Sequence, residues 1–165
     1  MTWVCVGIGS NIDPERNICA ALAELRRRFD PLRISTVYAN PPVGFVGDDF
    51  LNLVIRFDTD LPPLLLAAEL REIENRQQPS GKVARFAPRA LDLDLLLYAN
   101  AVLTADGVRV PRRDITRYAF VLRPLTEVAG DCRHPVLGVT FAQLWAQFDQ
   151  SHERLQPVVL PCIDR

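Results

Sequence analysis

The chain has 165 residues, enough for one domain with a substantial core, and its 48% of apolar residues is typical of a globular protein. Its net charge of -1 excludes a broad electrostatic attraction to nucleic acid or to an anionic membrane, so any anion site must come from a local cluster of cations. No segment has the pattern of a membrane span or a signal peptide, and we expect a cytoplasmic protein.

The first half of the chain alternates predicted strands and helices. Residues 3–9 are rich in β-branched side chains and predict a strand, and Asp13-Pro14 then marks the start of a helix with a 3.6-residue apolar period. Residues 32–38 predict a second strand, and residues 40–49 a long loop of a kind that is often functional. Residues 50–58 alternate as a half-buried strand does, with Phe50 and Asn52 on the face opposite the core.

The second half continues the alternation with shorter elements. The paired prolines at 62 and 63 start a helix that we expect to end near Gln77. The remaining predicted elements are a loop over 78–89, a strand over 91–98, a connection or hairpin over 100–110, short apolar elements over 120–122 and 125–129, and a helix capped by Thr140.

This order of elements predicts an α+β fold. Two long helices interleaved with four or more strands fit a ferredoxin-like sandwich, in which helices pack on a mainly antiparallel sheet. We expect one domain over residues 1–150, a C-terminal tail over residues 151–165, and a monomer.

The four cysteines (Cys5, Cys19, Cys132 and Cys162) show neither a C-x-x-C motif nor the spacing of metal ligands. Cys5 falls within a predicted strand, where a thiol behaves as a small apolar side chain. The simplest interpretation is a protein of the reducing cytosol.

An acidic motif, Asp92-Leu93-Asp94, lies in the clearest predicted strand. Side chains two residues apart on a strand point to the same side, so both carboxylates project together while the leucines between and around them face the core. Two adjacent carboxylates repel each other unless a cation lies between them, and oxygen ligands with room for water and phosphate suit Mg²⁺. The motif also fits two solvent-facing aspartates on an ordinary strand.

Cationic residues surround this motif. Arg89 precedes it, Lys82 and Arg85 lie in the loop before it, and a second cluster follows at Arg109, Arg112, Arg113, Arg117 and Arg123. A metal-binding acid pair beside arginine-rich loops suits a polyphosphate, because guanidinium groups neutralise the oxygens that the metal does not hold. Scattered surface charge explains Arg109, Arg113 and Arg123 equally well.

A third group of residues suits a flat heterocycle. Phe50 offers an aromatic face, Asn52 offers an amide that can match a donor-acceptor edge, and Phe120 can supply the other side of a stack. Each of them also fits a packing role.

Several motifs in this order resemble the 6-hydroxymethyl-7,8-dihydropterin pyrophosphokinase family, over about residues 1–148. They are Gly9-Ser10-Asn11, Pro41-Pro42-Val43-Gly44, Phe50-Leu51-Asn52, Pro88-Arg89-Ala90-Leu91-Asp92-Leu93-Asp94, Val110-Pro111, Ala119-Phe120-Val121-Leu122 and His134-Pro135. The resemblance implies a ferredoxin-like fold and transfer of pyrophosphate from ATP to the pterin hydroxymethyl group, with release of AMP, in folate biosynthesis.

The resemblance also implies roles for individual residues. Asp92 and Asp94 would hold two Mg²⁺ ions, and they would form the catalytic set with Arg89 and Arg85. The implied ATP-binding residues are Glu74, Lys82, Arg85, Arg89, Arg112 and Arg117. The implied pterin-binding residues are Pro42, Val43, Gly44, Phe50, Asn52, Phe120 and Asp92.

The chain departs from the family pattern on the nucleotide side. A Gly-Arg-x-Arg run is replaced by residues 78–81 (Gln-Pro-Ser-Gly), a Val-Pro-His run ends in Arg112, and Tyr118 stands where an arginine is usual. Three hypotheses therefore remain: an active pyrophosphokinase, a pterin-binding paralogue with weak or altered transfer, and a ferredoxin-like small-molecule sensor without chemistry.

Overall fold

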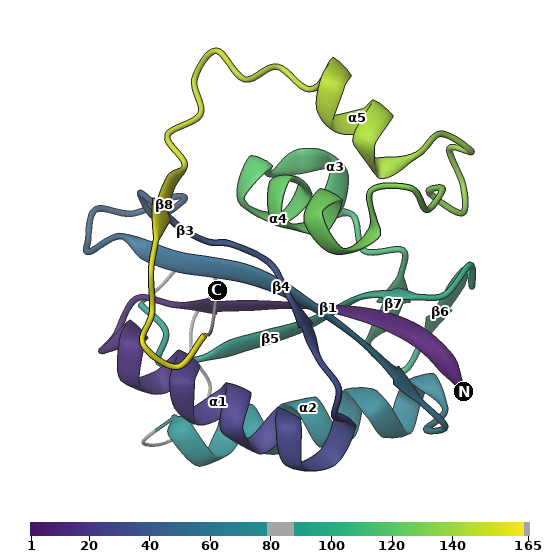
Figure 1. Ribbon diagram of the computed structural model, residues 1–165, viewed down its shortest axis with the longest axis horizontal. Coiled ribbons are helices and arrows are strands. Elements are labelled where there is room, and N and C mark those ends of the chain that lie inside the picture. Colours follow the sequence, from purple (N-terminus) through teal and green to yellow (C-terminus); the bar gives the residue numbers. More distant parts are fainter. Residues whose placement is uncertain (79–87, 164–165) are drawn as a thin grey trace.

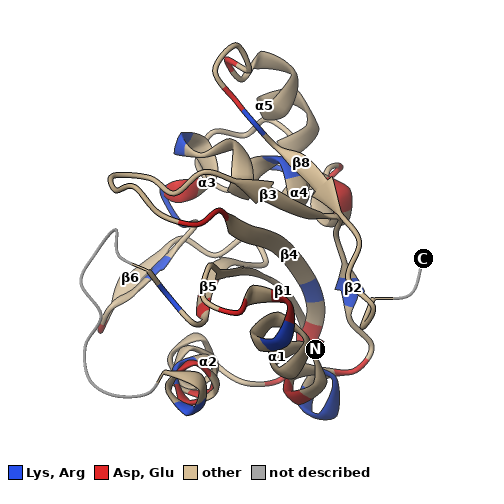
Figure 2. Ribbon diagram, turned by 90° about the vertical axis from the view of Figure 1, so that its left-hand side faces the viewer, with Lys and Arg blue, Asp and Glu red and all other residues tan. Residues whose placement is uncertain are grey.

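A computed structural model describes residues 1–78 and 88–163, and in it one β-sheet lies between two layers of helices (Figure 1). Helices α1 (Pro14–Phe29) and α2 (Pro63–Gln77) cover one face of the sheet. Helices α3 (Asp114–Arg117), α4 (Ala119–Ala129) and α5 (Phe141–Gln147) lie on the other side (Figures 1 and 2). This arrangement confirms the predicted α+β class.

The main sheet has the strand order β5-β1-β4-β3-β8, and the short strand β2 also pairs with β4. Its strands are β1 (Thr2–Ser10), β2 (Arg33–Ile34), β3 (Val37–Asn40), β4 (Phe50–Thr59), β5 (Asp92–Tyr98) and β8 (Gln156–Val158). Within the described residues, neighbouring strands pair antiparallel throughout, as predicted. A separate hairpin joins β6 (Leu103–Ala105) to β7 (Val108–Val110) through an Asp-Gly turn, which suits its two positive φ angles.

Each face of the sheet carries its own apolar cluster. The apolar stripe predicted for α1 is buried, and α1 and α2 pack on alternate residues of β1, β4 and β5, such as Val6, Ile55 and Leu93. The opposite residues of the same strands, including Cys5 and Val54, pack against α3, α4 and α5. This second face of the sheet therefore lies beneath these three helices.

A register shift changes the facing of one predicted core residue. We expected Leu97 to share the face of Leu93 and Leu95, but the pairing of β1 with β5 shifts between Cys5 and Val6. A bulge of this kind moves the residues beyond it to the other side of the strand. Leu96 and Leu97 consequently both belong to the cluster beneath α4.

Two other local predictions were too simple. Residues 32–38 form two short strands rather than one, because their pairing with β4 shifts by one residue between Ile34 and Tyr38. At this point the Ser35 hydroxyl accepts a hydrogen bond from the Val54 N–H at 2.9 Å. Residues 119–129 form one helix in which Pro124 is buried, rather than two elements separated by it. Proline removes one helical hydrogen bond, and burial of the apolar face of α4 offsets that loss.

The C-terminal segment packs on the domain, although we predicted a tail over residues 151–165. Strand β8 extends the sheet beside β3, and Leu160 and Ile163 are buried against the α1 side of the core. Cys19 and Cys162 form a disulfide with Cα atoms 5.7 Å apart, a pairing that we did not predict from the sequence. Cys5 and Cys132 are free.

In the described part of the chain, none of the helices has both the length and the apolar character that crossing a membrane requires.

Candidate active site

Two cavities adjoin one another at strand β5. The first, of about 340 Å³, lies between the sheet face and α4. The second, of about 290 Å³, lies beyond the edge of β5, between α2 and the β6–β7 hairpin. Four charged side chains line both cavities: Arg89, Asp92, Asp94 and Arg112. The structure thus places the acid pair where the two cavities meet.

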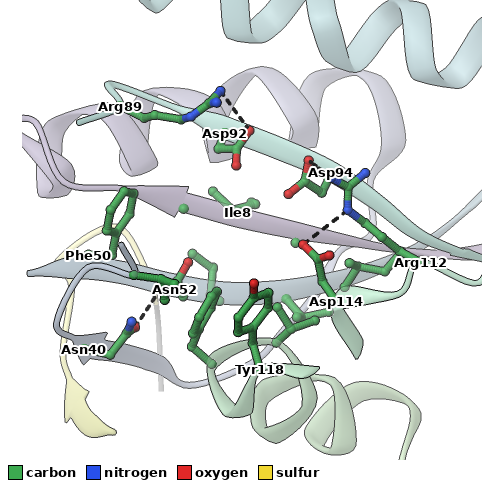
Figure 3. Close-up of a pocket in the computed structure, with 18 of the residues that line it drawn as sticks. Ile8, Asn40, Phe50, Asn52, Arg89, Asp92, Asp94, Arg112, Asp114 and Tyr118 are labelled. Atoms are coloured by element: carbon green, nitrogen blue, oxygen red, sulfur yellow. Dashed lines mark hydrogen bonds and ion pairs between the residues drawn. The ribbon is translucent and has the colours of Figure 1, made fainter. Parts of the chain in front are cut away.

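The acid pair projects from β5 into the first cavity, as the alternation of the strand predicts (Figure 3). Each carboxylate has a guanidinium nearby. Arg89 lies 3.8 Å from Asp92, and Arg112 lies 3.5 Å from Asp94 and also 3.5 Å from Asp114. The acid pair therefore lies between two guanidinium groups, one beside each carboxylate.

Two glycines of β1 form the floor of the first cavity. Gly9 pairs with Asp92 on one side and with Asn52 on the other, and Gly7 pairs with Asp94. A side chain at Gly9 would not fit, since a Cβ there would lie 2.7 Å from the Asn52 side-chain oxygen. Glycine in a strand interior often marks close approach of a ligand. Sequence reasoning missed this floor, and the alternation of the two glycines along a predicted strand is the signal that could have found it.

In the absence of a bound cation, burial destabilises the charged form of carboxylates at the acid pair. Burial, and then the neighbouring Asp92, raise the pKa of Asp94 to about 7. Glu74 on α2 lies close by and accepts a hydrogen bond from the Leu93 backbone at 2.8 Å. Burial raises the pKa of Glu74 to about 8, and the charge of Asp92 adds to this effect. Such carboxylates favour a site that receives positive charge.

The motif Gly9-Ser10-Asn11 holds the backbone around Arg89. The Asn11 side-chain oxygen accepts a hydrogen bond from the Arg89 N–H at 2.8 Å, and its amide donates to the Asp48 carbonyl at 3.2 Å. The Ser10 hydroxyl donates to the Ala90 carbonyl at 2.6 Å. Both side chains are buried and satisfied by these bonds, so they fix Arg89 and the loop over 41–49 relative to β1.

One wall of the first cavity is polar and aromatic. The Asn52 amide donates to the Asn40 side-chain oxygen at 2.7 Å, and this bond orients Asn52 toward the cavity (Figure 3). Phe50 contacts Phe45 of the loop edge to face, with centroids 6.3 Å apart. Val43 also lines the cavity, whereas its neighbours Pro42 and Gly44 do not. Sequence reasoning missed Asn40 and Phe45, because both contacts depend on tertiary pairing.

The opposite wall comes from α4. Phe120 lines the cavity and stacks on Tyr118, with ring centroids 5.0 Å apart. We had considered Tyr118 only as the replacement of an arginine, yet it also lines the cavity. Glu127 ties this helix to β3 by accepting hydrogen bonds from the Thr36 backbone at 2.9 Å and from the Tyr38 hydroxyl at 2.7 Å. The spacing of the two walls therefore depends on Glu127.

Several of the residues that the resemblance implies for ATP binding line the second cavity. Glu74 and Arg112 line it together with Arg71 and Arg109. Arg117 lies exposed on α3 and lines neither cavity. Lys82 and Arg85 lie outside the described residues.

The donor set at the acid pair suits a magnesium ion that also binds phosphate. Among residues 1–78 and 88–163, no group of three or more His, Cys, Asp or Glu side chains could hold a metal ion. A pair of carboxylates leaves most of an octahedral shell to water and phosphate oxygens, which is the usual arrangement for Mg²⁺ in phosphate-transfer sites. The raised pKa of Asp94 shows a buried carboxylate that a cation would stabilise.

Sequence comparisons connect this geometry to known proteins. A family model described as 7,8-dihydro-6-hydroxymethylpterin-pyrophosphokinase (HPPK) matches residues 5–130. The 2-amino-4-hydroxy-6-hydroxymethyldihydropteridine pyrophosphokinase of Haemophilus influenzae is 34% identical over 135 residues, which cover 79% of this chain and 84% of the relative. The enzyme of the same name from Pseudomonas aeruginosa is 38% identical over 138 residues, with 80% and 83% covered.

Solved structures show the same fold. The solved structure of an HPPK-DHPS protein in complex with substrates matches this chain over 91% of its length, with a TM-score of 0.73 and 10% sequence identity. The matched part is 44% of the length of that protein. The likeness confirms the ferredoxin-like sandwich predicted from the order of helices and strands.

Proposed function

The chain belongs to the 7,8-dihydro-6-hydroxymethylpterin-pyrophosphokinase family, and we propose that its first cavity binds the pterin and its second cavity binds ATP. The protein is an ATP-dependent pyrophosphokinase. It transfers pyrophosphate from ATP to the hydroxymethyl group of 6-hydroxymethyl-7,8-dihydropterin and releases AMP, a step of folate synthesis. The observation that carries the assignment of the cavities is the acid pair that lines both of them.

The first cavity has the chemistry that a pterin needs. A pterin is flat and has a row of donors and acceptors along one edge. Asn52, held by Asn40, can hydrogen-bond that edge, while Phe50 and Phe120 offer aromatic faces on either side. Tyr118 backs Phe120 and restricts its rotation. Loop residues Pro42, Val43 and Gly44 then close around the edge of the ring.

The second cavity has the chemistry that a triphosphate needs. Arg89 and Arg112 reach the region of the acid pair from two directions, and their guanidinium groups can each bind two phosphate oxygens. Glu74 holds the outer edge of β5 in place through the Leu93 N–H. Lys82 and Arg85 complete the proposed phosphate contacts, and Arg117 needs a movement of α3 to join them.

The reaction then depends mainly on positioning. The hydroxymethyl oxygen attacks the β-phosphorus, the bond from that phosphorus to the α-phosphate oxygen breaks, and AMP leaves. Asp92 and Asp94 would hold two Mg²⁺ ions, which would supply charge neutralisation on the phosphate oxygens. Asp92 also faces the hydroxymethyl group, and Arg89 stabilises the charge that develops on the transferred group.

A monomer in the cytoplasm completes the proposal. ATP is abundant in that compartment, which supports the location, whereas the disulfide between Cys19 and Cys162 argues against it. Mass spectrometry of protein alkylated in intact cells, without reduction, distinguishes the two, because a cytoplasmic enzyme should yield mostly alkylated Cys19 and Cys162.

The central test is the identity of the nucleotide product. ATP and MgCl₂ are incubated with the protein, with and without 6-hydroxymethyl-7,8-dihydropterin, and AMP and ADP are separated by chromatography. We expect AMP only when the pterin is present, and a loss of about 100-fold or more in Asp94→Asn. Asp58→Asn, an exposed aspartate on β4, is the matched control. Formation of ADP, or no product from a protein that binds the pterin, would contradict the assignment.

A further inference from the structure

Arg112 lies between two carboxylates of the site. Its guanidinium lies 3.5 Å from Asp94 and 3.5 Å from Asp114, and its side chain lines both cavities (Figure 3). Its backbone N–H donates to the Leu96 carbonyl at 3.0 Å, which fixes the start of the side chain against β5. Arg112 therefore places a cation beside Asp94, one of the two carboxylates of the acid pair.

The contacts of Arg112 with the carboxylates of the site are long. Its Nε atom is buried and lies 3.5 Å from an Asp114 oxygen, an ion pair rather than a close hydrogen bond. Because Arg112 also lines the polar cavity beyond β5, its guanidinium can turn to the oxygens of a bound phosphate chain.

A divalent ion and this guanidinium compete for Asp94. Two cations that share one carboxylate lie within a few ångströms of each other, and their repulsion is only weakly screened in a partly buried site. Asp94 is 28% exposed and Arg112 36% exposed, so solvent reduces the repulsion without removing it. An anion placed between the two cations would relieve it, and a triphosphate is such an anion.

We propose that Arg112 is a resident counter-cation of the acid pair, which weakens binding of Mg²⁺ alone and turns to the phosphate chain when the nucleotide arrives. Metal and nucleotide then bind together, and neither binds well without the other. The proposal rests on the proposed function, because it takes Asp92 and Asp94 as the metal ligands. Arg112 is in this sense a nucleotide-binding residue that also sets the order of binding.

The test measures binding of metal and nucleotide separately, without catalysis. The first measurement is the Mg²⁺ concentration that gives half of the maximal rise in thermal unfolding temperature, at constant ionic strength and without nucleotide. The second is the affinity for α,β-methylene-ATP, in which the bond to be broken is blocked, measured by calorimetry at saturating Mg²⁺. The variants are Arg112→Gln, which removes the charge, and Arg112→Lys, which keeps it. Arg113→Gln is the matched control, because Arg113 is exposed and lines neither cavity.

We expect Arg112→Gln to need roughly tenfold less Mg²⁺ in the first measurement and to bind the nucleotide analogue roughly tenfold more weakly in the second, a size typical of coupled sites. Arg112→Lys should stay close to the wild type in the first measurement, and Arg113→Gln in both. An unchanged or higher Mg²⁺ requirement in Arg112→Gln would overturn the proposal. If the wild type binds α,β-methylene-ATP equally well without Mg²⁺, the metal site itself fails, and this proposal fails with it.

Discussion

Replacing Asp94 by asparagine should stabilise the free protein while removing a ligand of its proposed metal site. Burial raises the pKa of Asp94 from 3.8 to about 7, with Asp92 as the second cause. The folded state then binds more protons than the unfolded state between these two values, so the free energy of unfolding falls as the pH rises through this window. Asparagine has nearly the same shape and no charge, and it avoids this loss.

The size of the effect follows from the shift and the exposure of Asp94. About three pH units correspond to about 4 kcal/mol, which is an upper bound for a completely buried group. The side chain is 28% exposed and has Arg112 at 3.5 Å, and we therefore expect about 1–2 kcal/mol above about pH 7 after allowing for solvent screening. The advantage of the variant should shrink steadily with falling pH and be nearly lost near the unfolded-state pKa of 3.8, below which both states of the wild type are protonated.

Urea unfolding in the presence of EDTA measures this difference. The wild type, Asp94→Asn and the exposed control Asp58→Asn are compared at about pH 4.5, 6 and 8, where the control should differ from the wild type by less than about 0.5 kcal/mol. The reasoning is refuted if Asp94→Asn is less stable than the wild type at the highest pH. That outcome would mean that the pair with Arg112 stabilises the folded protein more than burial of the carboxylate destabilises it.

Two further substitutions and one chemical reduction test the walls and the C-terminal segment. Gly9→Ala should raise the KM for the pterin by roughly 10–100-fold, because the added Cβ would lie 2.7 Å from the Asn52 oxygen and displace the amide; an unchanged KM would contradict the role of Asn52. Glu127→Gln should lower stability by about 1–2 kcal/mol and raise the KM for the pterin more than that for ATP, and an equal effect on both would argue against a wall-spacing role. Reducing the disulfide between Cys19 and Cys162, 143 residues apart, should lower the free energy of unfolding by about 2–5 kcal/mol, and equal urea midpoints with and without reductant would show that the bond contributes nothing.

Local patterns predicted the elements and the acid pair. The apolar period of α1 and the alternation of β4 are properties of neighbouring residues, and the fold buries those faces as expected. Asp92 and Asp94 share a side of β5 for the same reason, so their joint projection required no knowledge of the tertiary structure. The order of the helices and strands then identified the sandwich.

Features that depend on pairing between distant strands were missed. Gly7 and Gly9 form the cavity floor only because β1 lies between β4 and β5 in one particular register, which no local pattern specifies. The bulge that moves Leu97 to the second face is a property of the pair of strands and not of either strand alone. The disulfide joins α1 to the C-terminal segment, 143 residues further along the chain, and no local pattern specifies such a pairing.

The position of β5 explains how one strand can line two cavities. It lies at the end of the strand order, so one of its faces looks into the cavity under α4 while its outer edge borders the cavity beside α2. A central strand has a neighbour on each side and could offer only a face. At this edge Glu74 accepts a hydrogen bond from the Leu93 N–H at 2.8 Å, and the rest of the edge borders the second cavity. Carboxylates at this corner can contact a group on either side, as the proposed transfer between two bound molecules requires. Under the proposed assignment of the cavities, moving them to β1 would leave the nucleotide without these carboxylates beside it.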